Sequence, residues 1–353
     1  MTRPENQIVP DPRTRSKEQI WIGFFRESFA KGSQKAPLIV ENQGPHCCGW
    51  DSAFNLTAGY RRDDDIRIPF LGNAYDTFQK AQKELNSGIT GESILATKRT
   101  DYIASSAISN CDNIKHARRR QSVIKELVNA GLKLTGMGAC YENDKIPGVN
   151  YVSETAQQRK TVTFRRNVIK EHKFYLAFEN GLHCRDYISE KFWRNSLDYH
   201  AVPVVFGPWK DDLVKVAPKN SFIFLEDYES PKALVEHLNY LNNNDTAYLE
   251  YHAWRNDAVK AFEGGEEFEY VENSRHSESL CQSCLRITEM QKSGEEKIIK
   301  SYTHKLWADH PDDYCVENHP IPSDLYHPSV YTEKSKLYTY SDGKEPKQWF
   351  HKI

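Results

Sequence analysis

The chain has 353 residues, of which 39% are hydrophobic and 12% aromatic. Two compact domains are usual at this length, and the hydrophobic content is enough for a core, which excludes a mainly disordered chain. The 47 Lys and Arg residues nearly balance the 49 Asp and Glu residues, giving a net charge of −2. This balance excludes a protein that mainly coats nucleic acid, because neutralising phosphates needs a basic excess. No apolar run approaches the ~18–20 residues that span a bilayer.

The first part of the chain contains short apolar runs that predict strands and one segment that predicts a helix. Residues 1–18 are a polar lead without the apolar stretch of a signal peptide. Residues 20–25 (IWIGFF) have the composition of a buried parallel strand, and residues 102–108 predict another strand. A helix is predicted over 115–130, and a further strand over 132–135.

The clearest strand–helix–strand unit lies in the middle of the chain. Residues 174–178 (FYLAF) predict a strand, and residues 201–206 (AVPVVF) predict the returning strand. Between them, Asp186 is suited to cap a helix that runs to about Tyr199. Another strand and an amphipathic helix are predicted at 221–225 and 230–242. This alternation predicts an α/β fold with parallel sheets.

Ligands of an open parallel sheet bind beyond the carboxyl ends of its strands, and this rule selects the first candidate residues. Ser109 and Asn110 follow one predicted strand, and Glu179 and Asn180 follow another. Arg118 lies near the start of the helix after the first of these strands. An arginine beside a helix N-terminus suits a phosphate group, because its charge and the helix dipole both favour an anion.

Other charged runs could also bind a ligand, although each has a plainer interpretation. The ammonium of Lys191 could neutralise a phosphate and the carboxylate of Glu190 could hold a ribose hydroxyl, but such pairs are usually solvated helix faces. The arginine run 118–120 is more often an exposed turn. The run Asp63–Asp65 fits a D-x-D cation site, yet after two arginines it is more simply a turn with internal ion pairs. No P-loop or GxGxxG motif is present.

The cysteines favour disulfides in an oxidising compartment over free or metal-bound thiols. Among the eight cysteines, Cys281 and Cys284 form a CxxC, and Cys47 and Cys48 are adjacent. A second CxxC or a matching histidine pair, which zinc would need, is missing. The N-glycosylation triplets that begin at Asn55 and Asn244 fit the same compartment.

A resemblance to a known family joins these weak signals. The run FYLAFENGLHCRDYISEKFWRNSLDYHAVPVVFGP (174–208) resembles the donor-binding signature of the inverting α1,3/α1,4-fucosyltransferases, in more than twenty positions without a gap. Further resemblance lies in QIWIGFFRES (19–28), FNLTAGYRRDDDIRIP (54–69), SNCDNIKHARRR (109–120), SFIFLEDYESPKALVEHLNYL (221–241) and the CxxC. Most of 19–285 is covered.

The resemblance implies a GT-B-like fold, in which two Rossmann-like domains with parallel sheets face a cleft. We expect a polar lead over 1–18, an acceptor-side domain over 19–97, a GDP-fucose-binding domain over 98–265 and a C-terminal CxxC-containing extension over 266–353. The family normally has more strands, a stem and a membrane anchor before the segment that corresponds to residue 19. We therefore expect the acceptor-side domain to be incomplete and the anchor to be absent from this sequence.

The resemblance also implies an activity, the transfer of L-fucose from GDP-fucose to a GlcNAc hydroxyl of an N-glycan or lactosamine-type glycan in the Golgi lumen, with inversion. No metal is required, and dependence on manganese stays open. Arg118 and Lys191 would stabilise the departing diphosphate, and Glu190 would hold a ribose or fucose hydroxyl. The full set of implied donor contacts is Arg118, Asn180, Tyr187, Glu190 and Lys191, with Ser109, Asn110 and Tyr175 in addition.

The implied general base is Glu27, which would take the proton of the attacking hydroxyl. Phe29 stands where the family has a proline, and the segment between Glu27 and Phe54 is longer than usual, so Glu41 is the alternative base. Two other functions stay open. One is a non-catalytic GDP-sugar-binding protein with an eroded acceptor domain, and the other is a metal-dependent GT-A enzyme that uses Asp63–Asp65.

Overall fold

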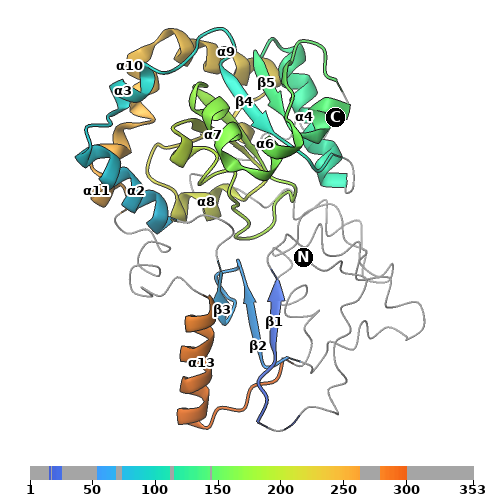
Figure 1. Ribbon diagram of the computed structural model, residues 1–353, viewed down its shortest axis with the longest axis vertical. Helices are drawn as coiled ribbons and strands as arrows, with labels where there is room; N and C mark the ends of the chain where they lie inside the picture. Colours follow the sequence, from blue (N-terminus) through green and yellow to red (C-terminus); the bar gives the residue numbers. More distant parts are fainter. Residues whose placement is uncertain are drawn as a thin grey trace.

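The computed structural model describes residues 16, 18–25, 54–68, 74–111, 115–143, 145–262 and 279–299. Two parallel sheets organise these residues, one of six strands and one of three. Figure 1 shows the larger sheet inside a body covered by helices, with the smaller sheet beside helix α13 (Ser279–Ser293). The described helices include none long and apolar enough to cross a membrane.

The six-stranded sheet is doubly wound. Its strands run in the order β6-β5-β4-β7-β8-β9, and all neighbours are parallel. The strands are β4 (Ala104–Ala107), β5 (Leu134–Met137), β6 (Asn150–Val152), β7 (Phe174–Phe178), β8 (Val202–Phe206) and β9 (Ile223–Phe224). The chain leaves β4 toward β5 and β6 and then returns to the other side of β4 as β7. The order therefore reverses between β4 and β7, where such sheets bind ligands.

Two hydrophobic cores lie on the two faces of this sheet, because side chains alternate along each strand. Phe174 and Phe178 belong to one core with residues of α4 and α9, whereas Tyr175 and Ala177 belong to the other. The helices are α4 (Lys115–Asn129), α5 (Ala139–Asn143), α6 (Ala156–Lys160), α7 (Val162–Lys170), α8 (Lys210–Val216), α9 (Pro231–Asn243), α10 (Asp245–Glu250) and α11 (Ala258–Phe262). Short 3-10 turns are η4 (Leu197–Tyr199), η5 (Leu225–Asp227) and η6 (Ala253–Arg255).

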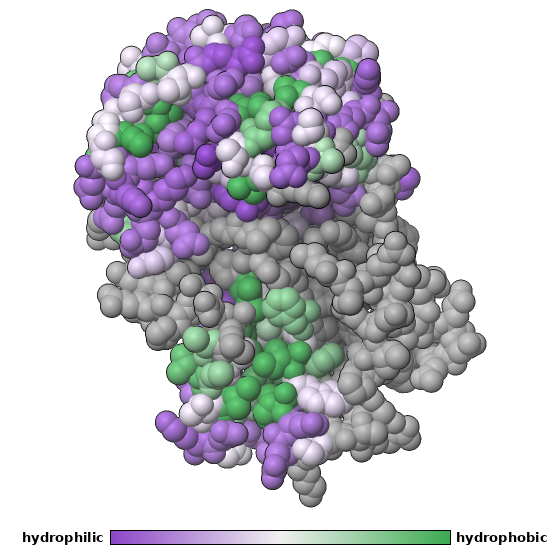
Figure 2. All heavy atoms as spheres, viewed as in Figure 1, coloured by the Kyte–Doolittle hydropathy of each residue, from purple (hydrophilic) through white to green (hydrophobic). Residues whose placement is uncertain are grey.

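The three-stranded sheet is formed by β1 (Ile22–Phe25), β2 (Leu56–Gly59) and β3 (Ile66–Arg67), in that order. Helix α13 packs against it through Met290, which is buried together with Leu56 and Ile66. Figure 2 shows hydrophobic residues gathered over this part of the molecule, whereas the large body is mostly hydrophilic on the same face. The segment that follows the CxxC therefore returns to the first sheet.

The helices α2 (Ala74–Asn86) and α3 (Gly91–Leu95) belong in space to the large body, although both lie in the range 19–97. Glu84 of α2 accepts hydrogen bonds from His200 (3.0 Å) and Arg255 (3.4 Å). The chain thus passes from the small sheet to the large body before α2, and the range expected for one domain divides between the two sheets.

The structure confirms the α/β class with parallel sheets and the strands expected near 20–25, 102–108, 132–135, 174–178, 201–206 and 221–225. The expected helix from Asp186 to Tyr199 is wrong. Asp186 has a left-handed backbone (φ 58°) instead of capping a helix. Several hydrogen bonds that follow span five residues, such as Asn195 N–H to Glu190 O, so only η4 forms a regular turn.

Candidate functional site

Arg120 forms hydrogen bonds with both segments that follow β4 and β7, the neighbouring strands between which the strand order reverses. Its Nη1 donates to the carbonyl of Phe178 at the end of β7 (3.2 Å), and its Nη2 donates to the carbonyl of Asn110 after β4. The guanidinium is buried, and its Nε has no partner among the described residues. Burial lowers the pKa of Arg120, while the nearby Glu179 carboxylate acts in the opposite direction. A buried cation therefore stands where this fold binds ligands.

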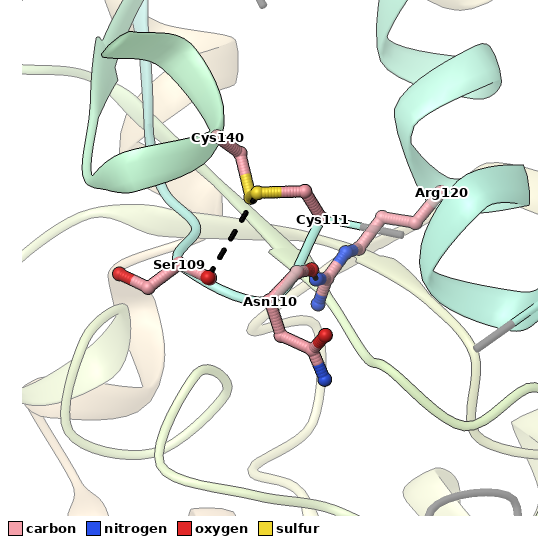
Figure 3. The surroundings of a disulfide bond; sticks show 5 residues. All are labelled: Ser109, Asn110, Cys111, Arg120 and Cys140. Carbon is pink, nitrogen blue, oxygen red and sulfur yellow. Dashed lines mark hydrogen bonds between the residues drawn. A yellow bond between two sulfur atoms is a disulfide. The ribbon is translucent and has the colours of Figure 1, made fainter. Parts of the chain in front are cut away.

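A disulfide fixes the segment after β4 from the side of β5 (Figure 3). Cys111 is bonded to Cys140 at the start of α5, with 5.2 Å between the Cα atoms. Beside it, Gly138 has φ 92°, and a Cβ at this position would lie 2.5 Å from the carbonyl oxygen of Ile108. The two loops are thus packed backbone to backbone, which holds Asn110 against Arg120.

Lys191 lies in a cluster of carboxylates after β7. Its Nζ donates to Glu179 (2.9 Å) and to the Ser189 hydroxyl (2.9 Å), and Glu190 Oε1 lies 3.5 Å away. Burial alone would lower the pKa of Lys191, but Glu179 and Glu190 outweigh it and raise that pKa above its ordinary value. Lys191 is therefore a cation held inside the protein.

The carboxylate of Glu190 is only partly used by the protein. Burial acts to raise its pKa, but the charges of Lys191 and Arg194 and hydrogen bonds to the carboxylate together outweigh burial, and the pKa lies below its ordinary value. Its Oε2 is buried without a partner among the described residues. An ionised carboxylate with a free oxygen is an acceptor for a ligand hydroxyl.

Tyrosine and asparagine side chains complete the surroundings of the cluster. The hydroxyl of Tyr187 donates to Asn180 Oδ1 (3.0 Å), and the hydroxyl of Tyr175 accepts from Asn195 (3.4 Å). Both tyrosines are buried. Asn110 Oδ1 is another buried oxygen without a partner in the described part of the chain.

The structure gathers most of the donor-site candidates but separates two of them from the buried cluster. Arg118 and Ser109 are exposed. Arg120, which is not among the predicted donor contacts, lies at the junction of the segments that follow β4 and β7. Its signal was the helical period, because Arg120 lies three residues after Ala117 and four before Ile124, both of which are buried. The bases Glu27 and Glu41 lie outside the described residues.

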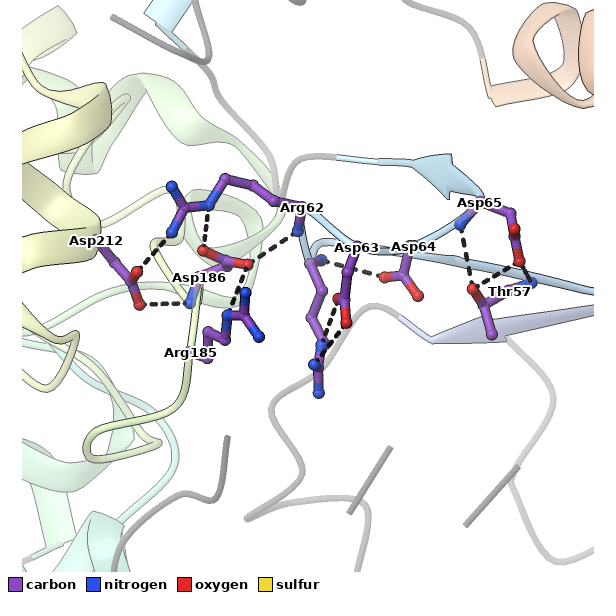
Figure 4. A network of polar contacts seen from close by, with 9 residues as sticks. Thr57, Arg62, Asp63, Asp64, Asp65, Arg185, Asp186 and Asp212 are labelled. Atoms are coloured by element: carbon purple, nitrogen blue, oxygen red, sulfur yellow. Dashed lines mark hydrogen bonds and ion pairs between the residues drawn. The ribbon is translucent and has the colours of Figure 1, made fainter. Parts of the chain in front are cut away.

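The run Asp63–Asp65 is engaged by its own surroundings (Figure 4). Asp63 accepts two hydrogen bonds from the Arg61 guanidinium at 2.9 Å, and Asp64 accepts from the Arg61 backbone. Asp65 binds Thr57 and Lys297. The described residues contain no group of three His, Cys, Asp or Glu side chains arranged for a metal ion. The interpretation as a turn with internal ion pairs is confirmed, and these contacts argue against a D-x-D cation site.

The cysteine and sequon predictions have mixed outcomes. Cys281 and Cys284 are free thiols, whereas Cys184, like Cys111 and Cys140, is disulfide-bonded. The Asn55 side chain is buried and donates to the Lys297 carbonyl at 2.8 Å, so it has no room for a glycan in the folded chain. Asn244 caps α10 near the surface, and a glycan at this position stays a prediction.

Known proteins resemble the chain over much of its length. A family model described as glycosyltransferase family 10 (fucosyltransferase), C-terminal part, matches residues 97–305. The chain is 30% identical over 255 residues to a 3-galactosyl-N-acetylglucosaminide 4-alpha-L-fucosyltransferase of Homo sapiens. It is 32% identical over 255 residues to a 4-galactosyl-N-acetylglucosaminide 3-alpha-L-fucosyltransferase of Gorilla gorilla gorilla. Each alignment covers 72% of this chain and 58% of the relative.

Among solved structures, an alpha1,3-fucosyltransferase with GDP-fucose matches with a TM-score of 0.45 and 15% identity, over 77% of this chain and 76% of that chain.

Proposed function

Because the chain belongs to glycosyltransferase family 10, the fucosyltransferases, we propose that it transfers L-fucose from GDP-fucose to a GlcNAc hydroxyl of a glycoprotein glycan. One observation carries the proposal: the buried Arg120 and the partly buried Lys191, which is paired with Glu179, lie at the reversal point of a doubly wound sheet. The names of the relatives, which act on N-acetylglucosaminides, support the acceptor class.

The cations act on the leaving group. As the bond from fucose to GDP breaks, negative charge grows on the diphosphate, and fixed positive charges stabilise that charge most where water is excluded. Lys191 supplies one charge. We assign the second to Arg120, since its Nε is unpartnered in the described part of the chain, while Arg118 could contact the donor only from the surface.

The free carboxylate oxygen of Glu190 accepts a hydrogen bond from a ribose or fucose hydroxyl. Asn180 and Tyr187, with their mutual hydrogen bond, and the buried Tyr175 line the donor side. Ser109 and Asn110 lie at the end of β4, where they can contact the donor from the opposite segment.

The acceptor hydroxyl is activated by Glu27, with Glu41 as the alternative, and attacks C1 of fucose from the face opposite GDP. One displacement inverts the configuration at that carbon. Separate Glu27→Gln and Glu41→Gln variants identify the base, because the variant that lacks the true base loses turnover but keeps GDP-fucose binding.

No metal is required, since cationic side chains neutralise the diphosphate. The Cys111–Cys140 disulfide supports an oxidising compartment, which we propose to be the Golgi lumen.

Transfer of radiolabelled fucose from GDP-fucose to a GlcNAc-terminated acceptor tests the proposal, together with calorimetric GDP binding. Lys191→Ala should lower transfer by at least a hundredfold. Lys173→Ala is the matched control. Lys173 is buried beside a carboxylate, Asp245, but it precedes β7 and so lies at the end of that strand opposite to the donor site. GDP binding without transfer to any glycan would favour the non-catalytic alternative, and no GDP binding by the folded protein would refute both.

A further inference from the structure

One arginine of the small sheet is bonded to two carboxylates of the large body (Figure 4). Arg62 lies in the turn between β2 and β3. Its Nε donates to Asp186 Oδ1 at 2.6 Å, and its Nη2 donates to Asp212 Oδ1 at 2.6 Å. Its backbone N–H donates to Asp186 Oδ2 at 2.9 Å. The remaining oxygen of Asp212 accepts the backbone N–H of Asp186 at 2.9 Å, so the contacts form a closed network.

The backbone of Asp186 is in the left-handed region (φ 58°), which costs free energy in any residue other than glycine, so the contacts of its side chain help to hold it there. It belongs to the segment 183–191, which we call the donor loop. Tyr187 follows it directly, and Lys191 ends the loop. The ring of Tyr187 also packs edge-on against Tyr60 of the β2–β3 turn, with 5.1 Å between ring centroids. The small sheet therefore contacts the donor loop through Arg62 and Tyr60.

Without Arg62, its two carboxylate partners would lose the cation that compensates their negative charge. Asp186 and Asp212 are largely buried and lie against each other, and the next cation, Arg185 Nε, is 3.9 Å from Asp186. Removing one member of a buried charge network leaves the others uncompensated, which favours rearrangement. The element most easily rearranged is the donor loop, since its conformation at Asp186 is unfavourable on its own.

We propose that Arg62 is a positioning residue that sets the conformation of the donor loop, and so presents Tyr187 and Lys191 to the guanosine diphosphate of the donor. The inference rests on the proposed function. It assigns to the small sheet a part in binding the donor, in addition to any part in binding the acceptor. Arg62 itself need not touch the nucleotide.

The test compares Arg62→Ala, Arg62→Lys and the wild type in GDP calorimetry, in the KM for GDP-fucose and in the KM for the acceptor. Arg62→Ala should raise the GDP dissociation constant and the KM for GDP-fucose at least tenfold, with the acceptor KM within about twofold. Arg62→Lys should recover part of the loss, because one ammonium can bond one of the two carboxylates. Arg99→Ala, which removes an ion pair with Asp101 on the surface, should leave every value unchanged.

The outcomes separate the two claims. If the wild type binds no GDP, the proposed function fails. If the wild type binds and transfers while folded Arg62→Ala keeps the wild-type GDP affinity, the positioning role is overturned, even when the melting temperature falls. Asp186→Asn gives a second measurement that does not depend on Arg62, since Asn tolerates the same backbone conformation but lacks the charge. It should weaken GDP binding less than Arg62→Ala does, and unchanged binding in both variants would also overturn the role.

Discussion

Lys191 is largely shielded from water, and the charges of Glu179 and Glu190 beside it favour its protonated form. The three side chains form a unit, in which Glu179 also accepts the backbone N–H (2.9 Å) and the hydroxyl (2.6 Å) of Ser189. Glu179 is thereby fixed, so the ammonium has a fixed position too. In the proposed complex with the donor, the ammonium would exchange part of its contact with these carboxylates for contact with phosphate oxygens.

The run of three arginines at the start of α4 gives the first prediction at this scale. Arg120→Met removes the buried guanidinium while keeping much of its length, and should raise the GDP dissociation constant at least tenfold because a charge beside the diphosphate is lost. Arg118→Met changes an exposed side chain and should alter that constant less than threefold. Calorimetric titration of both variants with GDP checks the pair. A larger loss in Arg118→Met would return the role to Arg118.

The same run illustrates what could be read from the sequence at the level of single residues. The similarity of 109–120 to the family's arginine-bearing segment predicts a donor-binding arginine within a run of three positions. The similarity does not tell which of the three arginines faces the core, because that depends on how the helix is turned about its axis in the folded protein. Arg120 shares the buried face with Ala117 and Ile124, whereas Arg118 is about 160° away from Arg120 around the helix.

At the scale of elements, the loops at the carboxyl ends of the strands are shaped by glycines that accept no side chain. Gly207, after β8, has φ 125°, and a Cβ there would lie 2.7 Å from the Cβ of Glu179. The backbone N–H of His183 also bonds to the Gly207 carbonyl. Two loops of the donor site thus approach each other as closely as the chain permits.

Gly207→Ala should therefore weaken both folding and GDP binding, because the new methyl group displaces Glu179 and with it Lys191. Gly131→Ala is the matched control: Gly131 also has a positive φ (102°), but nothing lies within 4 Å of its missing Cβ. The control should lose only about 1–2 kcal/mol of unfolding free energy and keep its affinity for GDP. Urea unfolding and GDP titration measure the two effects, and equal behaviour of the variants would contradict the steric argument.

Elements differ in how well their sequences predict them. The strand β7 and the helix α9 were predicted within about a residue, since continuous apolar runs and a serine cap depend on local chemistry. Residues 186–199 were not, although Ile188, Phe192 and Leu197, which a helix would place roughly on one face, are buried. Their backbone follows side-chain hydrogen bonds instead, above all the local bond of the Ser196 hydroxyl to the Lys191 carbonyl (2.6 Å) and the long-range attachment of Asp186 to Arg62.

At the scale of the whole molecule, the chain visits the two sheets in an order that its sequence does not reveal. The described part of the chain passes from β1–β3 of the small sheet to the large body, which it builds from α2 to α11, and returns to the small sheet with α13. Lys297, just after α13, binds Asp65 of the β2–β3 turn, and its carbonyl accepts from Asn55. The C-terminal segment therefore stabilises the same turn that carries Arg62.

Stability of the whole chain should depend on pH through a buried histidine on the large body. His172 Nδ1 donates to the Val168 carbonyl at 2.7 Å, and Nε2 lies 2.7 Å from the Thr135 hydroxyl, which can donate to it when the ring is neutral. Burial, reinforced by the charges of Arg99 and Lys98, lowers its pKa from 6.5 to about 4. The unfolded chain therefore takes up a proton between pH 6.5 and 4 that the folded chain does not, so acidification through this window favours unfolding.

His172→Gln removes this titration and gives the last prediction. The wild type should lose roughly 3 kcal/mol of unfolding free energy through His172 alone as the pH falls from 7 to 4, and the variant should lack that part of the loss. Buried carboxyls act in the opposite direction: burial raises the pKa of Asp64 to about 6, which favours the folded state on acidification. The difference between the two proteins isolates the histidine, because the carboxyls are common to both. Urea unfolding at pH 7, 5.5 and 4 measures it, and parallel pH profiles would show that His172 is free to ionise in the folded protein.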